Sequence, residues 1–370
     1  MKNLIIHVGF GKTGSSYIQS ALALNQKQLK KNSIYYPDHP RSSAASQGEI
    51  TSGNISPALD LDANAKKAAR WTLCNSLLYS NEGLFGDLHK NQERYRELNK
   101  KFRLHIILYI RNPLSHAISC YQQTVKRGGS VISAGAYISE HYKHINLLEA
   151  VIEFLEREDI PFTVLNYSKW KYNLLDSFYR AIGADSAENF TPPVKDKINR
   201  SMTNSEIKLQ RLFNRYVGKS SSRFISDPLC EELADIDSEI PHFSRAEYDA
   251  FVQRIESQVD RLNGQLSASE KLILADYPFD DKPSSENLAC FNDDQLDVVV
   301  REIATRLDVV RELEEHVDDF RDLALKLEQD NQYGVETAYT LIKAANLLRP
   351  EGPRIRNKLK EYREKLSSNN

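Results

Sequence analysis

The stretch LIIHVGFGKTGSSYIQSALAL, residues 4–24, decides the fold of this chain. Its apolar beginning, residues 4–8, predicts a buried strand, and the pattern over residues 17–29 predicts an amphipathic helix. Three glycines, one lysine and three hydroxyl residues stand between the strand and the helix. A turn of this kind directs backbone N–H groups and a helix N-terminus at one point, and it therefore suits a phosphate or sulfate group.

The lysine of this turn differs in position from the lysine of an ATPase or GTPase P-loop. That motif places its lysine after the last glycine, whereas Lys12 precedes Gly14 here. The glycines alone are also compatible with a plain tight turn that binds nothing. A lysine with clustered hydroxyls is more than such a turn needs, so we favour an anion site made by Gly11, Lys12, Thr13, Gly14, Ser15 and Ser16.

A second strand-to-helix junction follows further along the chain. Residues 104–110 predict a buried strand that ends at Arg111, and a helix is predicted over residues 114–126. The carboxyl ends of strands in open α/β sheets bind ligands. Arg111 and the hydroxyls of the next helix, Ser115 and Ser119, can therefore form a second oxyanion site. The structural alternative is a surface arginine with two solvated serines that bind nothing. We favour it less, because the arginine and the serines occur together in a chain that also carries the turn with Lys12.

Together, the two junctions resemble the sulfotransferase family that uses 3′-phosphoadenosine 5′-phosphosulfate (PAPS). The resemblance covers roughly residues 1–300, and residues 121–129 are similar to stretches of its bacterial carbohydrate-type branch. It implies that the first turn holds the 5′-phosphosulfate and that Arg111 and Ser119 hold the 3′-phosphate. It also implies a hydroxyl acceptor, of the carbohydrate or glycan class, and 3′-phosphoadenosine 5′-phosphate (PAP) as the product.

A catalytic base is suggested by Glu82, which follows a short predicted strand over residues 76–80. In the resembling family a glutamate at such a strand end often takes the proton of the acceptor hydroxyl, and a carboxylate in a partly desolvated cleft can do so. A helix cap or an ion pair is the structural alternative for Glu82. Three histidines are competing bases: His7, His89 and His116.

Lys12 is expected to stabilise the charge that builds on the departing 5′-phosphate oxygens. No metal is expected to be needed, because the lysine and the helix dipole supply positive charge at this point. The strand over residues 104–110 also lacks the acidic residue that would hold magnesium in a P-loop enzyme.

Two further segments complete the predicted site. Residues 199–203 precede a predicted helix and resemble the family's loop over the nucleotide, which adds Asn199, Arg200 and Ser201 as candidate cofactor contacts. A plain helix entry with a capping box is the structural alternative. The candidate acceptor contacts are Tyr121, Gln122, Gln123 and Lys126, together with the loop over residues 38–60. Polar residues with one aromatic suit a sugar, but they would also suit a phenol or a polar lipid headgroup.

The whole chain predicts an α/β fold, with a P-loop-like, three-layer domain around a mostly parallel sheet. Strands are expected near residues 3–8, 33–36, 76–80, 104–110 and 161–167. Beyond about residue 190 only helices are expected, including 268–276 and a charged tract over 293–329. The charges of this tract favour a solvated helix face, and docking of a partner is the less favoured alternative. We expect a sulfotransferase domain over residues 1–290 and a helical C-terminal extension over residues 291–370.

Net charge, cysteine spacing and the distribution of apolar residues limit the classes of protein to which this chain can belong. The formal net charge of −2 provides no basic field for nucleic acid or a membrane surface. The spacing of Cys74, Cys120, Cys230 and Cys290 favours free thiols in a reducing compartment. The first strand begins by residue 3, and no run of eighteen apolar residues exists. We therefore expect a cytoplasmic, bacterial enzyme without an integral membrane segment.

Two rival functions remain open. A P-loop phosphotransferase acting on a small metabolite is disfavoured by the position of Lys12 and by the missing acidic strand end. A catalytically inactive nucleotide-binding interaction protein is disfavoured because its drift should have eroded at least one of Lys12, Glu82, Arg111 and Ser119. The sequence leaves the acceptor and the oligomeric state open.

Overall fold

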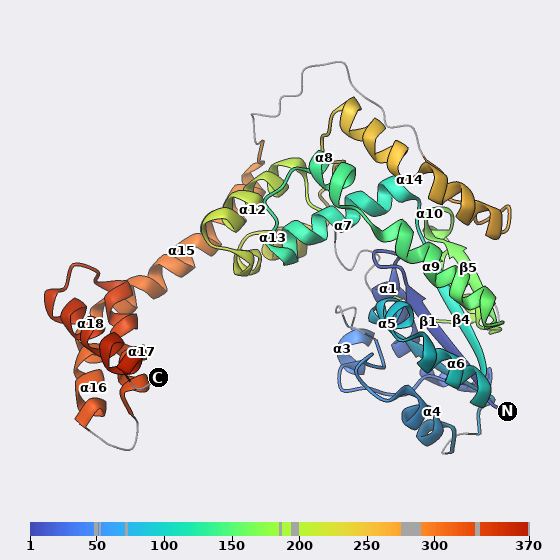
Figure 1. The fold of residues 1–370 in the computed structure, drawn as a ribbon, viewed down its shortest axis with the longest axis horizontal. Helices are drawn as coiled ribbons and strands as arrows, with labels where there is room; N and C mark the ends of the chain where they lie inside the picture. The colour runs from blue at the N-terminus through green and yellow to red at the C-terminus, as the bar shows by residue number, and fades with distance from the viewer. Residues whose placement is uncertain are drawn as a thin grey trace. The chain divides into compact units, whose positions relative to one another are not determined.

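The computed structural model describes residues 1–47, 51, 53–70, 73–184, 187–193, 200–274, 290–329 and 334–368. The chain divides into two compact units, Met1–Cys290 and Phe291–Asn370 (Figure 1). Each unit has its own hydrophobic core.

The first unit is built on a five-stranded sheet in which every pair of neighbouring strands is parallel. Its strands lie in the order β2-β3-β1-β4-β5. Their bounds are β1 (Asn3–Gly9), β2 (Ile34–Tyr35), β3 (Ser76–Ser80), β4 (Arg103–Ile110) and β5 (Phe162–Asn166). The prediction of an α/β fold with a mostly parallel sheet is confirmed.

Helices connect and cover these strands. Up to β5 they are α1 (Ser15–Leu24), α2 (Gln26–Lys31), α3 (Ser42–Ser46), α4 (Leu61–Arg70), α5 (Gly83–Lys90), α6 (Gln92–Lys101), α7 (Pro113–Gly128), α8 (Ala134–Ala136), η1 (Tyr137–His141) and α9 (His144–Arg157). After β5 they are α10 (Tyr167–Trp170), α11 (Leu174–Ala181), η2 (Ala187–Asn189), α12 (Asn204–Tyr216), η3 (Lys219–Arg223), α13 (Ser226–Glu232) and α14 (Arg245–Gln265).

The sheet is buried on both faces, as a parallel sheet requires. Alternate residues of β1 belong to different clusters, because successive side chains of a strand point to opposite faces. Leu4, Ile6 and Val8 join a core formed with α4 to α7, α9 and α14. Ile5 joins a second core formed with α1, α2 and α11. The unit therefore has helices on either side of the sheet, in three layers (Figure 1).

The strand order places a topological switch point between the carboxyl ends of β1 and β4. These strands are neighbours, but the chain leaves β1 toward the β2 side of the sheet and leaves β4 toward β5. The loops after the two strands therefore diverge, and ligands of open α/β sheets bind at such a point. The two predicted anion-binding segments follow these two strands, at residues 10–16 and from Arg111.

Several predicted helices differ from the structure. The helix predicted over residues 17–29 begins at Ser15 and is interrupted at Asn25, whose side chain donates to the carbonyls of Ala21 and Thr191. Within the helix predicted over 268–276, the described residues 268–274 form a turn and an extended segment. Tertiary contacts of Glu270, given below, replace local helix formation there.

In its described residues, the second unit consists of helices joined by short non-helical segments. It contains α15 (Asp293–Glu315), α16 (Val317–Gln329), α17 (Gly334–Leu348) and α18 (Pro353–Ser368). The last three, drawn in red shades in Figure 1, share a small core that includes Val317, Ile342 and Tyr362. The predicted tract over 293–329 is divided at His316 into α15 and α16.

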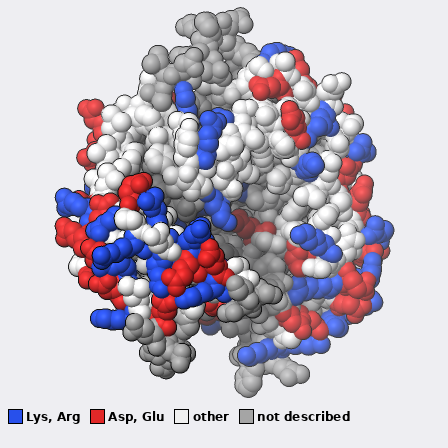
Figure 2. All heavy atoms as spheres, turned by 60° about the vertical axis from the view of Figure 1, so that its left-hand side comes forward, with Lys and Arg blue, Asp and Glu red and all other residues white. Residues whose placement is uncertain are grey.

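Charged side chains of both signs are interspersed on the face shown in Figure 2, in keeping with the net charge of −2. Among the described helices, none combines the length and the apolar character that crossing a membrane requires. All four cysteines carry free thiols.

Candidate functional site

The loop between β1 and α1 adopts a conformation that few sequences allow. Gly11 and Gly14 have positive φ angles of 84° and 81°, and Lys12 between them has a φ of 53°. The left-handed φ of Gly14 favours glycine, and a Cβ there would also lie 2.5 Å from a terminal methyl of Leu174, which would have to move. A non-glycine residue in the left-handed region stores strain, which typically accumulates at binding sites.

The same loop carries hydroxyls that the protein itself leaves unused. The side chains of Thr13 and Ser15 are buried, and their Oγ atoms have no hydrogen-bond partner within the described part of the chain. Helix α1 begins directly after Gly14, which has no side chain to cap the first N–H groups. Buried polar atoms are normally paired, so these two hydroxyls are able to donate to an acceptor-rich ligand such as a phosphate. Ser16 is half-buried in the first turn of α1.

Lys12 lies between α7 and the end of β3. Its Nζ donates to the Oε1 of Gln123 on α7 at 2.6 Å. Burial lowers the pKa of Lys12, and the negative charge of Glu82 partly opposes this effect. The ammonium is therefore held in a partly desolvated position, where its interaction with an anion is stronger than in water.

Arg111 connects the second junction to this loop. Its Nη1 donates to the carbonyl oxygen of Lys12 at 3.0 Å, and its Nε donates to the Ser115 hydroxyl at 3.1 Å. The guanidinium carbon lies 5.4 Å from the centre of the Tyr167 ring. Within the described residues, Nη2 has no protein acceptor. The structure thus brings the Arg111 guanidinium to the backbone of the loop that carries Lys12, at the switch point of the strand order.

Ser119 lies one helical turn after Ser115 on α7 and is half-buried. Residues four apart share a helix face, so its hydroxyl is on the side of α7 that carries the contact of Ser115 with Arg111. No contact of the Ser119 side chain is seen among the described residues, and its predicted role stays a prediction.

A network of hydrogen bonds around the residue after Arg111 was not predicted from the sequence. The side chain of Asn166, at the end of β5, donates to the Asn112 Oδ1 at 3.0 Å, and the Ser168 hydroxyl accepts from the Asn112 N–H. Buried Glu270 accepts from the Asn166 N–H at 2.6 Å and from the Trp170 indole. These bonds fix the end of β4, from which Arg111 projects.

A cavity of about 900 Å³ opens beside Glu82. Its walls come from the segment after β2, from residues 53–59, and from the end of β3, and they include Tyr35, Pro37, His39, Pro57 and Tyr79. The carboxylate of Glu82 is exposed at this cavity, rather than desolvated as the sequence suggested. The cavity therefore presents aromatic and polar surface next to the exposed carboxylate of Glu82.

The turn that carries Glu82 is held from both sides. The side chain of Asn81 accepts from the Gly83 N–H at 2.7 Å and donates to the Ile55 carbonyl. Gly53, with φ of 93°, approaches β3 so closely that a Cβ would lie 1.8 Å from the Ser80 carbonyl oxygen. The segment over residues 53–57 is thus fixed against the end of β3, and it keeps the cavity wall next to Glu82.

The competing histidines are placed elsewhere. His7 is fully buried with its Nδ1 2.8 Å from the Ser80 hydroxyl, and burial lowers its pKa to about 3. His116 is also fully buried, contacts the Tyr142 hydroxyl and the Phe10 carbonyl, and has a pKa far below its usual value because of burial. His89 lines a separate cavity of about 810 Å³. This geometry favours Glu82 over His7 and His116 as a base.

The burial of His7 predicts acid sensitivity. Because the pKa of His7 is about 3 when folded and about 6.5 when unfolded, only the unfolded chain takes up a proton below pH 6.5. Its stabilising contribution is complete above that pH and is lost as the pH falls toward 3. We expect a loss of about 2 kcal/mol in unfolding free energy between pH 7 and pH 5 from this group. Urea unfolding should show a smaller pH dependence for His7→Asn, and an unchanged dependence would contradict the assignment.

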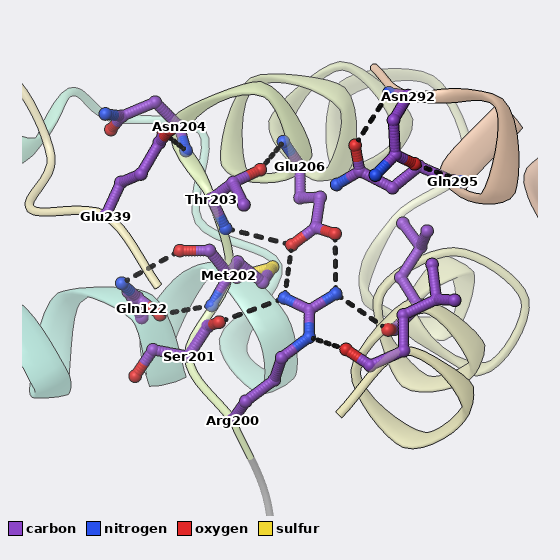
Figure 3. A network of polar contacts seen from close by, with 12 residues as sticks. Gln122, Arg200, Ser201, Met202, Thr203, Asn204, Glu206, Glu239, Asn292 and Gln295 are labelled. Atoms are coloured by element: carbon purple, nitrogen blue, oxygen red, sulfur yellow. Dashed lines mark hydrogen bonds and ion pairs between the residues drawn. The ribbon is translucent and has the colours of Figure 1, made fainter. Parts of the chain in front are cut away.

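Arg200 is not available to a nucleotide. Its guanidinium forms a bidentate pair with Glu206 at 2.7 Å and also donates to three carbonyls, those of Ser201, Leu229 and Leu233. All five N–H groups of the side chain are thereby used (Figure 3). Thr203 and Glu206 form the capping box of α12, the structural alternative for this segment. Asn199 lies outside the described residues.

Three of the four acceptor contacts predicted on α7 serve the interior instead. Tyr121 is 1% exposed and donates to the Ile132 carbonyl. The amide of Gln122 bonds both the N–H and the carbonyl of Met202, and so ties α7 to the segment before α12 (Figure 3). Lys126 is buried and lies 3.2 Å from the Asp227 carboxylate. Gln123 alone of the four contacts the candidate site, through Lys12.

Comparison with known proteins adds no relative: no protein-family model matches this chain, and a search of curated proteins gives no match either.

Proposed function

We propose that the first unit is a P-loop-like sulfotransferase domain, which transfers the sulfuryl group of PAPS to a hydroxyl of a carbohydrate-class acceptor. The observation that carries this proposal is the convergence of the Lys12 loop and Arg111, with Nη1 of Arg111 3.0 Å from the Lys12 carbonyl. A ligand with two separate phosphate groups would engage both cations at once. PAPS has two such groups and supplies an activated sulfuryl group.

The loop residues fit the 5′ end of such a ligand. The unpartnered hydroxyls of Thr13 and Ser15 and the uncapped start of α1 would donate to phosphate oxygens. Gly11 and Gly14 allow the loop its left-handed backbone. Arg111 and the hydroxyls on its side of α7, Ser115 and Ser119, would hold the 3′-phosphate. Tyr167, which already stacks on Arg111, would limit where that guanidinium can move.

Two side chains would carry the chemistry. The Glu82 carboxylate would take the proton of the acceptor hydroxyl as its oxygen bonds to sulfur and the bond from sulfur to the 5′-phosphate oxygen breaks. The Lys12 ammonium would donate to that departing oxygen and offset its new charge. The electrostatic effect of Glu82 on Lys12 supports this pairing, because the two groups must act on opposite sides of one sulfur atom.

The acceptor would enter through the cavity beside Glu82. Its volume of about 900 Å³ is sufficient for a ligand larger than one sugar ring. The rings of Tyr35 and Tyr79 offer apolar surface, and Asp38, His39 and Asn64 offer hydrogen-bonding groups. This placement replaces the predicted acceptor surface on α7, except for Gln123.

The proposal is tested by following radiolabelled sulfate from PAPS onto a panel of glycan, phenolic and lipid acceptors. Label on a glycan hydroxyl supports the proposal in full, and label on a phenol or lipid would correct the acceptor class. No transfer to any acceptor by a protein that binds PAP would favour the rival of an inactive binding module.

Removing the second anion site should weaken binding of the product nucleotide. Arg111→Ala is expected to cost about 1.5–3 kcal/mol in PAP affinity, the range for hydrogen bonds to a charged group. Calorimetric titration measures this directly, and Arg103→Ala, at the exposed opposite end of β4, is the matched control. Equal PAP affinity in the two variants would remove Arg111 from the site.

A further inference from the structure

Helix α15 of the second unit carries an apolar stripe along its surface. The stripe consists of Leu296, Val300, Ile303, Leu307 and Val310, spaced by alternating steps of four and three residues. This is the heptad spacing of a coiled coil, with Val300 and Leu307 at a positions and the others at d positions. Val300 and Leu307 are 62% and 63% exposed, which is unusual for aliphatic side chains.

The stripe is not used by the core of its own unit. The buried cluster of this unit starts at Val317 and contains residues of α16, α17 and α18, with no residue of α15 among those described. Leu296 and Val310, at the two ends of the stripe, are also more than 40% exposed. A continuous apolar seam of this kind on a helix typically packs against another helix.

We propose that this stripe pairs with the same stripe of a second copy of the chain, with the two α15 helices antiparallel. If Val300 packs against the partner's Val310, then Ile303 packs against the partner's Leu307, and every a position faces a d position. All five stripe residues then lie in one seam, with only Leu296 facing a polar position, the partner's Glu314.

Charge decides the orientation. The flanking e positions are Asp297, Ala304 and Arg311. In the antiparallel pair Asp297 faces the partner's Arg311 twice, and the small Ala304 faces its own copy at the two-fold axis. A parallel pair would instead place Arg306 of each chain against Arg311 of the other, which is repulsive. The antiparallel pair keeps one like-charged contact, between the two copies of Arg306.

The flanking charges are free to exchange partners. Asp297 lies 3.3 Å from Arg301, and Arg311 lies 3.3 Å from Asp308, both within the same helix. All four side chains are at least 48% exposed in these pairs, so each pair contributes little and can be given up. The stripe extends over about 21 Å of helix, and we expect a modest dimer, with a dissociation constant in the micromolar range.

Sedimentation of the full chain between about 1 and 200 μM tests the pairing. We expect dimer at the high end and a dissociation constant at least about tenfold weaker for Leu307→Asp. Leu347→Asp is the matched control, because Leu347 is 73% exposed on α17 outside the stripe. A monomer at every concentration, or a dimer that Leu307→Asp leaves unchanged, would overturn the proposal.

Charge reversal and cross-linking test the orientation. Asp297→Arg should weaken the dimer, and the double variant Asp297→Arg with Arg311→Asp should restore it. In a Cys290→Ser background, Ala304→Cys should form a disulfide-linked dimer, whereas Asp297→Cys should do so only together with Arg311→Cys. A cross-link through Asp297→Cys alone, or failure of the double charge reversal to restore association, would contradict the antiparallel arrangement.

Discussion

Lys12→Met is expected to lower turnover by about a thousandfold. Lys12 carries the positive charge of the proposed anion-binding loop, and its ammonium lies within the electrostatic reach of Glu82. In the proposed reaction its charge opposes the negative charge that develops on the departing oxygen, and removal of one such preorganised donor costs up to about a thousandfold in rate. Single-turnover transfer of labelled sulfate from PAPS, with the best acceptor of the screen, measures the effect.

Two controls isolate this charge. Lys100→Met changes an exposed lysine on α6, outside the proposed site, and it should leave turnover within a few-fold of the original. Lys12→Arg keeps a cation and should retain part of the PAP affinity that Lys12→Met loses. If Lys12→Met and Lys100→Met have equal turnover, the proposed role of Lys12 in the reaction is wrong.

The lowered pKa of Lys12 gives the same assignment a pH signature. The free protein holds the charged form of Lys12 below this pKa and loses it as the pH rises through it. Affinity for PAP should therefore begin to fall at a lower alkaline pH than the usual lysine value of about 10.4 implies. Because arginine stays charged throughout this range, the PAP affinity of Lys12→Arg should depend less on pH at alkaline values.

Glu82→Gln is expected to reduce turnover by at least about a hundredfold while leaving PAP affinity intact. The amide keeps the size of the carboxylate but cannot accept the proton of the acceptor hydroxyl, and general-base catalysis contributes about this much. The Asn81 contacts that hold the turn involve backbone groups and Ile55, so they do not depend on the charge of Glu82.

Asp38→Asn is the informative comparison, because Asp38 is the second acidic side chain at the same cavity. We expect it to change the Michaelis constant for the acceptor more than the rate. A full loss of turnover in Asp38→Asn with normal turnover in Glu82→Gln would transfer the role of base to Asp38.

Much of the sheet could be predicted from the sequence. The strand over residues 76–80 has the predicted bounds, and the strands predicted near 3–8 and 104–110 differ from β1 and β4 by one residue at an end. Strands of a sheet buried on both faces are continuous apolar runs, and their patterns are short and unambiguous. The helix interruption at Asn25 was not predictable, because it depends on a contact with Thr191 far along the chain.

Site residues could be predicted only where the neighbouring sequence alone determines their position. Arg111 follows β4 directly, and Lys12 lies three residues after β1. The order of these two neighbouring strands therefore brings the two segments together. Tyr121 and Gln122 have polar groups that suit a sugar, but the helical register of α7 turns them toward the core and toward Met202. Nothing in the local sequence indicates that Glu270 supports the end of β5.

The cavity beside Glu82 could be anticipated only in part. The loop over residues 38–60 was expected near the site. The part of this loop that lines the cavity is held in place because Asn54 forms hydrogen bonds with β3 and Gly53 packs closely against it. Such contacts between distant segments carry no periodic signal in the sequence.

In the proposed site, one nucleotide with two separate phosphates bridges the Lys12 loop and Arg111. Calorimetric titration of the full chain with PAP and with AMP, both without magnesium, is the decisive measurement of this bridging. We predict that PAP binds at least about tenfold more tightly than AMP, because only PAP carries the 3′-phosphate that Arg111 would hold. Equal affinity for the two nucleotides, or binding of ATP with magnesium in place of PAP, would contradict the claim.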